Sequence, residues 1–369
     1  MRVLICGGGV IGASIAYFLS RRGVRPIVIE RTGLACAASG KAGGFLALDW
    51  CDGTPLEQMA RRSFNLHARL SGEVGSQWGY RRLTTYSGQV IDGRAGRPHR
   101  EPGAWWLSDQ VTIERCLGTG DTTAQVQPER FTTAMMRAAQ ENGAELRIGQ
   151  VTGLVLDRSG TEVAGVNIEG NVIPCDAVVI ALGPWSRLAA RWLPLPAVYG
   201  LKGHSLVFKT GTAIPGEALF LEYQDGRSLS CSPEVFPRPD GTTYVCAISS
   251  DSPVPLDPAD VTPDEGSTER LEAICARLSP VFAHSAILAR QACFRPITRD
   301  GLPLIGPIPG VRNACVATGH SVWGILNAPA TGKHRSPPGA RSLPHPAQHQ
   351  QDPGEPGCRW RWHTRTWCR

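Results

Sequence analysis

Apolar and polar positions along the first thirty residues follow the pattern of a β-α-β unit. The stretch Arg2–Cys6 (RVLIC) is typical of a short buried strand, and Ala13–Arg22 carries apolar residues at helical spacing. Gly23 follows as a helix end, and Pro26–Glu30 (PIVIE) predicts a second, parallel strand. We therefore expect an α/β fold whose first strand begins at about residue 2.

Glycines occupy the turn between the first strand and the helix. Gly7 permits a tight turn, Gly9 lets the backbone approach a pyrophosphate, and Gly12 allows the helix to pack close to the strand. The helix N-terminus offers free N–H groups and a partial positive charge to phosphates. Glu30 ends the second strand, where a carboxylate accepts hydrogen bonds from ribose hydroxyls. The pattern predicts a dinucleotide site, and it does not separate FAD from NAD.

The segment after the second strand distinguishes the two cofactors. Residues 35–47 (ACAASGKAGGFLA) are small and rich in glycine and serine, so backbone can lie against a ligand too long for one β-α-β unit. Further along, Gln127–Gly143 reads as a helix entered through a proline, and Asp176–Ser186 reads as a strand that ends at a glycine. Residues 293–332 contain an Arg-Pro pair, a Pro-x-Ile-Gly strand and a Gly-His turn.

With these motifs the chain resembles the D-amino-acid oxidase superfamily of FAD enzymes, which includes glycine oxidase, sarcosine oxidase and D-amino-acid dehydrogenase. Within it, the chain is most similar to a group of FAD oxidoreductases of fungi and plants. The resemblance extends from about Arg2 to Lys333. It implies an α/β protein with a discontinuous Rossmann-type FAD-binding domain and an inserted α+β substrate domain built on a mixed sheet.

The resemblance also implies where the two domains lie. The FAD-binding pieces are expected at 1–60, 125–192 and 286–333, and the substrate domain at 61–124 and 193–285. The second substrate piece contains alternating, strand-like runs, including Ser205–Lys209 and Thr243–Ile248.

FAD is the implied cofactor, and its binding residues are expected in the β-α-β turn, the small-residue segment and the closing segment. The set is Gly7, Gly9, Val10, Ile11, Gly12, Glu30, Arg31, Ser39, Gly40, Lys41, Ala42, Gly43, Gly44, Val151, Ala181, Gly183, Trp185, Gly319, Gly324 and Ile325.

Two residues are the candidates for catalytic roles. Arg295 occupies the position at which the family's Arg-Pro motif presents a guanidinium to a substrate carboxylate, a contact suited to a planar fork of donors. A structural salt bridge is the alternative. His320, in the Gly-His turn, is expected to contact substrate or to tune the pH dependence, unless only its backbone matters.

Five other residues carry weaker hypotheses. Cys293 lies near the point where some sarcosine-oxidase relatives attach FAD covalently, although a plain buried cysteine is the commoner case. Lys202 and His204 lie on a strand-like run that could face the flavin ring. The pair Trp105–Trp106 is interpreted as packing rather than as a cation-binding cage.

Composition narrows the class of protein. Hydrophobic residues make up 42% of the chain and charged residues 19%, which is typical of a globular protein, and no apolar run is long enough to span a membrane. The net charge of +6 does not indicate a nucleic-acid partner. The 12 cysteines are scattered without CxxC spacing, which argues against a disulfide framework or a metal site. Because no targeting segment precedes the first strand, we expect a cytoplasmic protein.

The C-terminus departs from the family pattern. Residues Asn327–Lys333 resemble the start of a long amphipathic helix, but Pro337 and Pro338 rule out its continuation. The stretch 334–369 is rich in proline, glutamine, arginine and histidine, which predicts disorder. It is either a basic functional arm or, as we favour, the product of an altered reading frame or retained intron.

The sequence therefore predicts an FAD-dependent oxidase or dehydrogenase that oxidises the C–N bond of a small amino acid or N-substituted amino acid. Hydride transfer to flavin N5 is the expected step, with oxygen or another electron acceptor completing the cycle. A flavoprotein with a regulatory or trafficking role, an inactive C-terminally altered isoform and a nicotinamide-dependent dehydrogenase are the alternatives.

Overall fold

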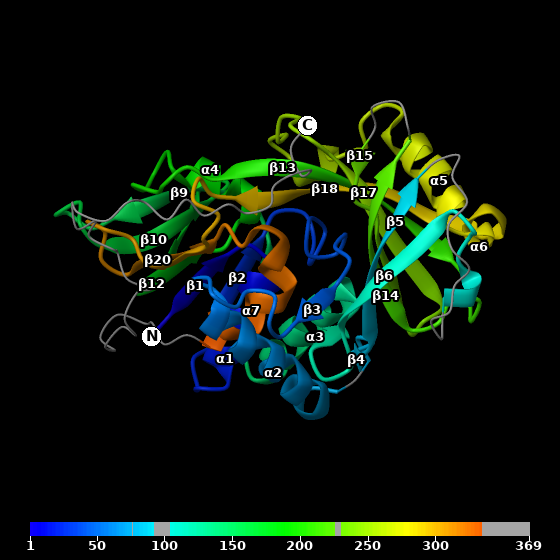
Figure 1. Ribbon diagram of the computed structural model, residues 1–369. Helices are drawn as coiled ribbons and strands as arrows, with labels where there is room; N and C mark the ends of the chain where they lie inside the picture. The colour runs from blue at the N-terminus through cyan, green and yellow to red at the C-terminus, as the bar shows by residue number, and fades with distance from the viewer. Residues whose placement is uncertain (76, 92–103, 226–229, 334–369) are drawn as a thin grey trace, which may run out of the picture.

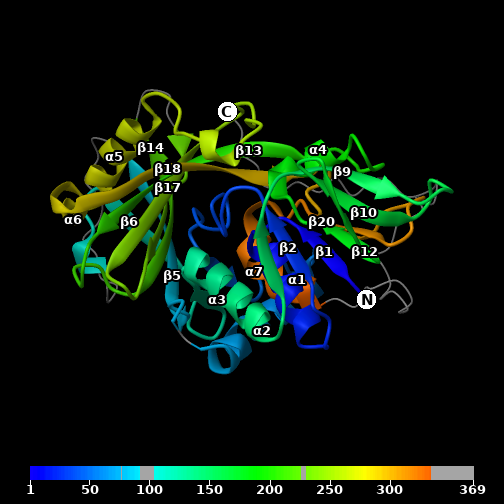
Figure 2. The ribbon, with the colours of Figure 1, turned by 180° about the vertical axis from the view of Figure 1, so that it is seen from behind.

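The computed structural model describes residues 1–75, 77–91, 104–225 and 230–333 (Figures 1 and 2). The predicted disorder of residues 334–369 falls outside this part of the chain. Within it, two large sheets lie side by side, and the long strands β13 (Tyr199–Lys209) and β18 (Ala286–Ile297) reach from one toward the other (Figure 1).

The first sheet is six-stranded and mostly parallel. Its order is β19 (Leu304–Pro307), β20 (Ala314–Thr318), β12 (Ala177–Ile180), β1 (Val3–Cys6), β2 (Ile27–Glu30) and β8 (Glu145–Ile148). Only the pairing of β19 with β20 is antiparallel. The central strands β1, β2 and β12 are buried at every position, as expected for parallel strands covered on both faces.

Four helices cover one face of this sheet: α1 (Val10–Ser20), α2 (Glu57–Glu73), α3 (Pro128–Glu141) and α7 (Gly324–Lys333) (Figure 2). They share one apolar core with the sheet. The other face packs against a three-stranded antiparallel sheet of β9 (Val151–Leu156), β10 (Val163–Ile168) and β11 (Asn171–Pro174), and against α4 (Ser186–Ala189).

Helix α1 begins at Val10 rather than at the predicted Ala13, because the glycine turn passes directly into the helix. It ends at Ser20, and Gly23, with φ +80°, turns the chain back toward β2. Helix α3 begins where the sequence predicts it: Pro128 is its first residue, and the side chain of Gln127 accepts a hydrogen bond from the Arg130 N–H at 2.6 Å.

The second sheet is eight-stranded and mixed. Seven strands lie in the order β18, β13, β17 (Thr242–Ser250), β16 (Glu234–Pro237), β14 (Glu217–Gln224), β5 (Thr84–Ile91) and β6 (Val111–Gly118), and β15 (Ser230–Cys231) pairs with β14. Neighbouring strands are antiparallel except β14 with β5. Short helices η1 (Ala104–Trp106) and η3 (Pro258–Asp260) lie in its connections.

The two faces of this mixed sheet differ in what they contact. Side chains such as Leu206, Phe208 and Val245 pack on the outer face with α5 (Ser267–Leu278) and α6 (Pro280–His284). The alternate residues, including Val207 and Tyr244, face the other way, because successive residues of a strand point to opposite sides. They meet β3 (Phe45–Ala47), which forms a small sheet with β7 (Thr123–Gln125) and β4 (Arg81–Arg82).

The architecture confirms the predicted α/β class with a Rossmann-type domain and a substrate domain on a mixed sheet. The residue limits of the domains stay a proposal, and two observations bear on them. Residues 286–297 form strand β18 of the eight-stranded sheet, and Ala60, Phe64 and Leu70 of α2 pack into the core of the helices that cover the six-stranded sheet. The chain thus crosses between the two parts as often as the resemblance implies, but α2 and β18 lie on the other side of the proposed limits.

No helix in the described ranges is long and apolar enough to cross a membrane. The ten cysteines of these ranges are all free thiols.

Candidate active site

A cavity of about 610 Å³ lies between the two sheets. One end is formed by residues that follow the carboxyl ends of β1, β2 and β12, and the floor is formed by the inner face of the eight-stranded sheet. Its volume is typical of a site for a small molecule or cofactor.

Glycines shape the end of the cavity at the β1–α1 turn. Gly7 has φ +114°, and a Cβ at this position would lie 2.3 Å from the carbonyl oxygen of Ala181. A Cβ on Gly12 would lie 1.9 Å from the carbonyl oxygen of Gly7, so only glycine lets α1 pack this closely on the turn. The first-turn N–H groups of α1 have no intrahelical acceptor, and they are directed at this end of the cavity.

Glu30 organises the same turn from the end of β2. One of its carboxylate oxygens accepts the Gly8 N–H at 2.7 Å, and the other accepts the Thr32 N–H at 3.0 Å. The carboxylate is buried and lines the cavity. Oε2 has a further lone pair with which to accept a hydroxyl, whereas Oε1 also lies 3.9 Å from the Cys36 thiol.

The segment between β17 and α5 closes this end of the cavity from the side of the eight-stranded sheet. Arg31 donates to the Leu256 carbonyl at 2.8 Å and pairs with Asp257 at 3.0 Å. Trp185, in η2 (Gly183–Trp185), donates its indole N–H to the Pro255 carbonyl at 2.8 Å. Pro258, three residues further along, lines the cavity beside Glu30 and Arg31.

Lys202 and His204 anchor the far end of that segment rather than facing the cavity. The Lys202 Nζ lies 2.5 Å from the Asp264 carboxylate, and the Asp264 N–H donates to His204 Nε2 at 3.1 Å. Burial works against the charge of Asp264, yet hydrogen bonds from Lys202, Ser250 and Ser252 lower its pKa. Neither Lys202 nor His204 is among the cavity-lining residues. Their role here is to hold a loop.

The small-residue segment between β2 and β3 lies against the start of α1. Ser39 Oγ accepts the Val10 N–H at 2.9 Å, which fixes the segment on the helix N-terminus. Gly44 has φ +88°, and a Cβ there would lie 2.0 Å from the Val126 carbonyl oxygen. The segment can follow this path because its residues are small.

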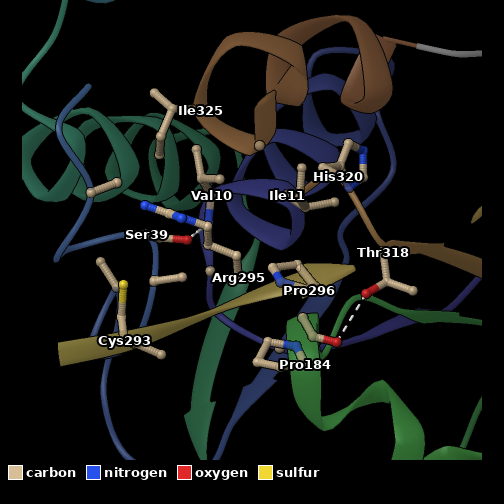
Figure 3. A pocket seen from close by; sticks show the side chains of 18 of the residues that line it. Val10, Ile11, Ser39, Pro184, Cys293, Arg295, Pro296, Thr318, His320 and Ile325 are labelled. Atoms are coloured by element: carbon tan, nitrogen blue, oxygen red, sulfur yellow. Dashed lines mark hydrogen bonds between the residues drawn. The ribbon is translucent and has the colours of Figure 1, made fainter. Parts of the chain in front are cut away.

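Two further loops meet where β12 and β20 end. Thr318 donates its hydroxyl to the Gly183 carbonyl at 2.9 Å (Figure 3). The Ser186 hydroxyl donates to Thr318 Oγ1 at 3.0 Å. Ala181, Gly183 and Thr318 all line the cavity.

Arg295 lies on the floor of the cavity. It projects from β18 on the same face as Cys293, two residues earlier (Figure 3). Its guanidinium passes over Gly203, whose Cβ would lie 3.4 Å from Nη2, and it donates to Ser249 Oγ at 3.4 Å. Burial lowers its pKa, but Cys246 and Glu234 raise it more, so the guanidinium stays charged.

Burial shifts the pKa of three side chains beside Arg295 in the same direction. It raises the pKa of the Glu234 carboxyl, an effect that Arg295 opposes in part. Burial also raises the pKa of the Tyr244 hydroxyl well above its ordinary value and raises that of the Cys293 thiol. Cys293 is therefore held as a thiol rather than as the nucleophilic thiolate.

His320 is buried in the turn before α7. Its Nε2 lies 3.0 Å from Thr331 Oγ1, whose hydroxyl donates to the Asn327 carbonyl at 2.9 Å, so His320 donates through Nε2. Nδ1 has no hydrogen-bond partner among the described residues. Burial lowers the pKa of His320 to about 4, which leaves the ring neutral near pH 7. This environment does not support the expected tuning of the pH dependence near neutrality.

Helix α7 is stabilised by α2 at the point where a proline interrupts it. Pro329 has no N–H, so the Ile325 carbonyl lacks its helical donor. His67 supplies a replacement: its Nε2 lies 2.9 Å from the Ile325 oxygen and 3.2 Å from that of Leu326. The Ala330 N–H donates to Ser63 Oγ at 3.1 Å. Gly324 and Ile325, at the start of α7, line the cavity.

Most of the residues singled out from the sequence lie together on the cavity wall. The lining includes Gly7, Gly9, Val10, Ile11, Glu30, Arg31, Ser39, Ala42, Gly43, Gly44, Val151, Ala181, Gly183, Trp185, Cys293, Arg295, His320, Gly324 and Ile325. Gly12, Gly40, Lys41 and Gly319 are not part of it. Gly12 and Gly40 pack against backbone: an added Cβ would lie 1.9 Å from the Gly7 carbonyl oxygen at Gly12 and 2.2 Å from the Ala35 carbonyl oxygen at Gly40. These two glycines therefore determine the shape of the loops.

Other lining residues have no motif that marks them. They include Glu234, Tyr244 and Cys246 and the aromatic residues Phe45, Trp50, Phe220, Phe236 and Trp323. Strand alternation alone could have grouped Glu234 with Phe236, and Tyr244 with Cys246, on one face. Trp106 is buried against Phe282, with ring centroids 6.0 Å apart, in keeping with the interpretation of Trp105–Trp106 as packing. Trp105 is exposed, so the interpretation does not hold for it.

The glycine turn after β1, the carboxylate at the end of β2 and a cavity at the carboxyl ends of these strands occur together here. They are typical of α/β proteins that bind a dinucleotide beyond the carboxyl ends of a parallel sheet. Residues 2–335 match the model of the DAO family, described as FAD dependent oxidoreductase. The chain belongs to this family, and its cofactor is FAD.

Individual relatives agree with that assignment. A candidate oxidoreductase of Schizosaccharomyces pombe is 30% identical over 364 residues, covering 90% of this chain and 92% of its own. The glycine oxidase of Pseudomonas aeruginosa is 27% identical over 358 residues, covering 89% and 92%. The crystal structure of glycine oxidase from Geobacillus kaustophilus superposes with a TM-score of 0.75 at 24% identity, covering 90% of this chain and 92% of that one, and supports the fold.

Proposed function

We propose that this protein oxidises the C–N bond of an amino acid or N-substituted amino acid whose carboxylate binds Arg295. The observation that carries the proposal is the position of the Arg295 guanidinium on the cavity floor, with no carboxylate within 4 Å among the described residues. A partly buried cation without an ion-pair partner suits an anionic group of a ligand.

The cavity fits FAD. The turn offers the backbone N–H groups of Gly9 and Ile11 to a pyrophosphate, while those of Gly7 and Val10 donate to the Ile29 carbonyl and to Ser39 Oγ. Added Cβ atoms at Gly7 or Gly44 would collide with backbone. Glu30 would accept the hydroxyls of the adenosine ribose. Residues such as Ala42, Gly43, Ala181, Gly183 and Ile325 would surround the rest of the cofactor.

When bound, FAD supplies the two-electron acceptor for the reaction and passes the electrons to oxygen or to another acceptor. The substrate loses hydrogen from the carbon next to nitrogen as a hydride and loses a proton from the nitrogen, so that C–N becomes C=N. Water then hydrolyses the imine to a carbonyl compound and ammonia or an amine.

Arg295 would orient the substrate by its carboxylate, and the buried floor would exclude bulk water while hydride is lost. His320 is proposed to contribute through position rather than through charge, since its ring is neutral near pH 7. Cys293 is proposed to remain a free thiol, because burial raises its pKa.

The first test is the visible absorption spectrum of the purified chain before and after acid precipitation. We expect flavin bands near roughly 370 and 450 nm that pass into the supernatant, as for non-covalent FAD. Anaerobic addition of a panel of amino acids and N-methyl amino acids should then bleach the 450 nm band for at least one of them.

The opposite results separate the alternatives. Flavin that stays with the pellet would indicate a covalent link, with Cys293 the first residue to replace. A bound flavin that no member of the panel reduces would favour a regulatory flavoprotein. A colourless protein would favour an isoform that no longer retains its cofactor.

The location remains a proposal as well. We infer a cytoplasmic protein without a nucleic-acid partner, supported by free thiols throughout the described residues. Cell fractionation with an antibody against the chain would decide between the cytoplasm and an organelle.

A further inference from the structure

A basic side chain, Arg295, and an acidic one, Glu234, line the floor of the cavity without being paired to each other. Arg295 and Glu234 influence one another's pKa, yet they form no ion pair within 4 Å, and neither has another ionic partner among the described residues. The Glu234 carboxyl accepts a hydrogen bond from the Cys246 thiol at 3.5 Å. Both groups are therefore available to a ligand that enters the cavity.

The register of the sheet explains why the two charges share one face. On β16, Glu234 is paired with Cys246 of β17 and with Phe220 of β14. Arg295 of β18 is paired with Leu201 of β13. Paired residues point to the same side of a sheet, and Glu234, Cys246, Phe220, Leu201 and Arg295 all line the cavity.

A continuous group of aromatic rings borders Glu234. Phe45 lies 4.9 Å from Trp50 and 4.9 Å from Phe220 between ring centroids, and Phe220 lies 5.5 Å from Phe236. Trp50 also approaches Trp323 at 6.5 Å. All five rings line the cavity, and we call them the aromatic wall.

We propose that Glu234 binds the amino group of the substrate while Arg295 binds its carboxylate, and that the aromatic wall receives a bulky apolar substituent. The cavity would thus select an amino acid zwitterion with a large apolar side chain or N-substituent. This inference rests on the proposed function, and it assigns to Glu234 a role in positioning the substrate.

The chemistry of the floor favours a zwitterion over a simple acid or amine. A ligand with only a carboxylate would satisfy Arg295 but offer Glu234 no cationic partner, and burial, which raises the pKa of Glu234, would then favour its protonated form. A ligand with only an amine would leave the Arg295 guanidinium without an anionic partner. Glycine would satisfy both charges but leave the aromatic wall without contact, at a loss of roughly 25 cal/mol for each Å² of apolar surface left unburied.

Binding to the holoenzyme under anaerobic conditions tests the inference, with tryptophan fluorescence as the readout because Trp50 and Trp323 line the cavity. The probes are both enantiomers of phenylalanine, 3-phenylpropionate, 2-phenylethylamine and glycine. We expect one phenylalanine enantiomer to bind at least about 10-fold more tightly than each of the other three compounds.

Glu234→Gln should reduce the preference for phenylalanine over 3-phenylpropionate by about 10-fold, because an amide of the same shape carries no charge. The matched control is Glu222→Gln on the adjacent strand β14, whose exposed carboxylate is bound by Ser232 at 3.1 Å and does not line the cavity. That variant should keep the wild-type preference.

An unchanged preference in Glu234→Gln would overturn the role of Glu234. Equal affinity of the wild type for glycine and phenylalanine would overturn the role of the aromatic wall. Both results differ from failure of the proposed function, in which phenylalanine binds with the expected preference but no amino acid reduces the flavin.

Discussion

The two ends of the cavity bind by different chemistry. At the end formed by the six-stranded sheet, backbone dominates: Gly7 and Gly12 allow close approach, and the Glu30 carboxylate holds the N–H groups of Gly8 and Thr32. On the floor formed by the eight-stranded sheet, side chains dominate, with Arg295 presenting a basic group and Glu234 an acidic one.

This difference determines which substitutions each end of the cavity tolerates. A backbone site depends on shape, so adding one methyl group can destroy it while a change of surface charge cannot. A side-chain site depends on the charge and position of its side chains, so an isosteric replacement alters the selectivity for ligands without disturbing the fold. The cofactor end should therefore be sensitive to small steric changes, and the floor to changes of charge.

The largest expected effect comes from a methyl group at the cofactor end. Gly12→Ala would place a Cβ 1.9 Å from the Gly7 carbonyl oxygen, so the turn must move. We expect FAD affinity to fall at least ~100-fold and stability to fall by about 1–3 kcal/mol, as for overpacked sites. Flavin fluorescence titration and urea unfolding measure the two effects.

Gly72→Ala is the matched control, because Gly72 also lies in a helix but an added Cβ meets no atom within 4 Å. It should leave FAD affinity unchanged and stabilise the chain by up to about 1 kcal/mol. Equal FAD affinity in both variants would show that the close packing of α1 on the turn is not required for binding.

The second-largest expected effect comes from removing the positive charge of Arg295 from the floor of the cavity. Arg295→Met should weaken carboxylate ligands by about 100-fold, since a charge-assisted hydrogen bond contributes about 1.5–3 kcal/mol. FAD content should stay at the wild-type level. Steady-state kinetics with the best substrate, or the fluorescence titration, provides the measurement.

Arg290→Met is the control on the same strand. Arg290 pairs with Glu272 at 2.8 Å on the protein surface, and exposed pairs of this kind contribute little. The role of Arg295 fails if both variants bind carboxylate ligands with wild-type affinity.

The smallest expected effect is a pH dependence of stability. Burial lowers the pKa of His67 and of His320 from 6.5 to about 4. The unfolded chain therefore binds more protons between these pH values, and stability falls as the pH drops from about 6.5 to 4. Each histidine contributes a slope of about 1.4 kcal/mol per pH unit in this range.

Urea unfolding at pH 7, 6 and 5 checks the slope. His67→Gln should be less sensitive to acid than the wild type by about that amount. Parallel curves for the wild type and His67→Gln would contradict the buried, neutral state of His67.

The same division explains what could be predicted from the sequence. The cofactor end is local: the glycines, α1 and Glu30 lie within thirty residues, and each has a conformational or hydrogen-bonding requirement that few residue types meet. Even there, Gly12 was expected both to let the helix pack closely and to bind FAD, and in the structure it packs on Gly7 without lining the cavity.

The floor could be predicted only in part. Arg295 stands in a recognisable motif, but Glu234, Tyr244 and Phe220 come from strands whose order, β16, β17 and β14, no local pattern gives. Lys202 shows the converse case: its strand was identified, yet its side chain faces Asp264 rather than the cavity. Register and strand order arise from long-range pairing, and they decide whether a given side chain faces the cavity.

The contacts of Arg31 and Trp185 with residues 255–257 have a consequence for cofactor exchange. The segment that closes the nucleotide end belongs to the eight-stranded sheet, and it is tied back to that sheet through Asp264. We expect a nucleotide bound beside Glu30 and Arg31 to exchange more readily when this segment separates from the six-stranded side. A change at Lys202 would then alter exchange although Lys202 does not line the cavity.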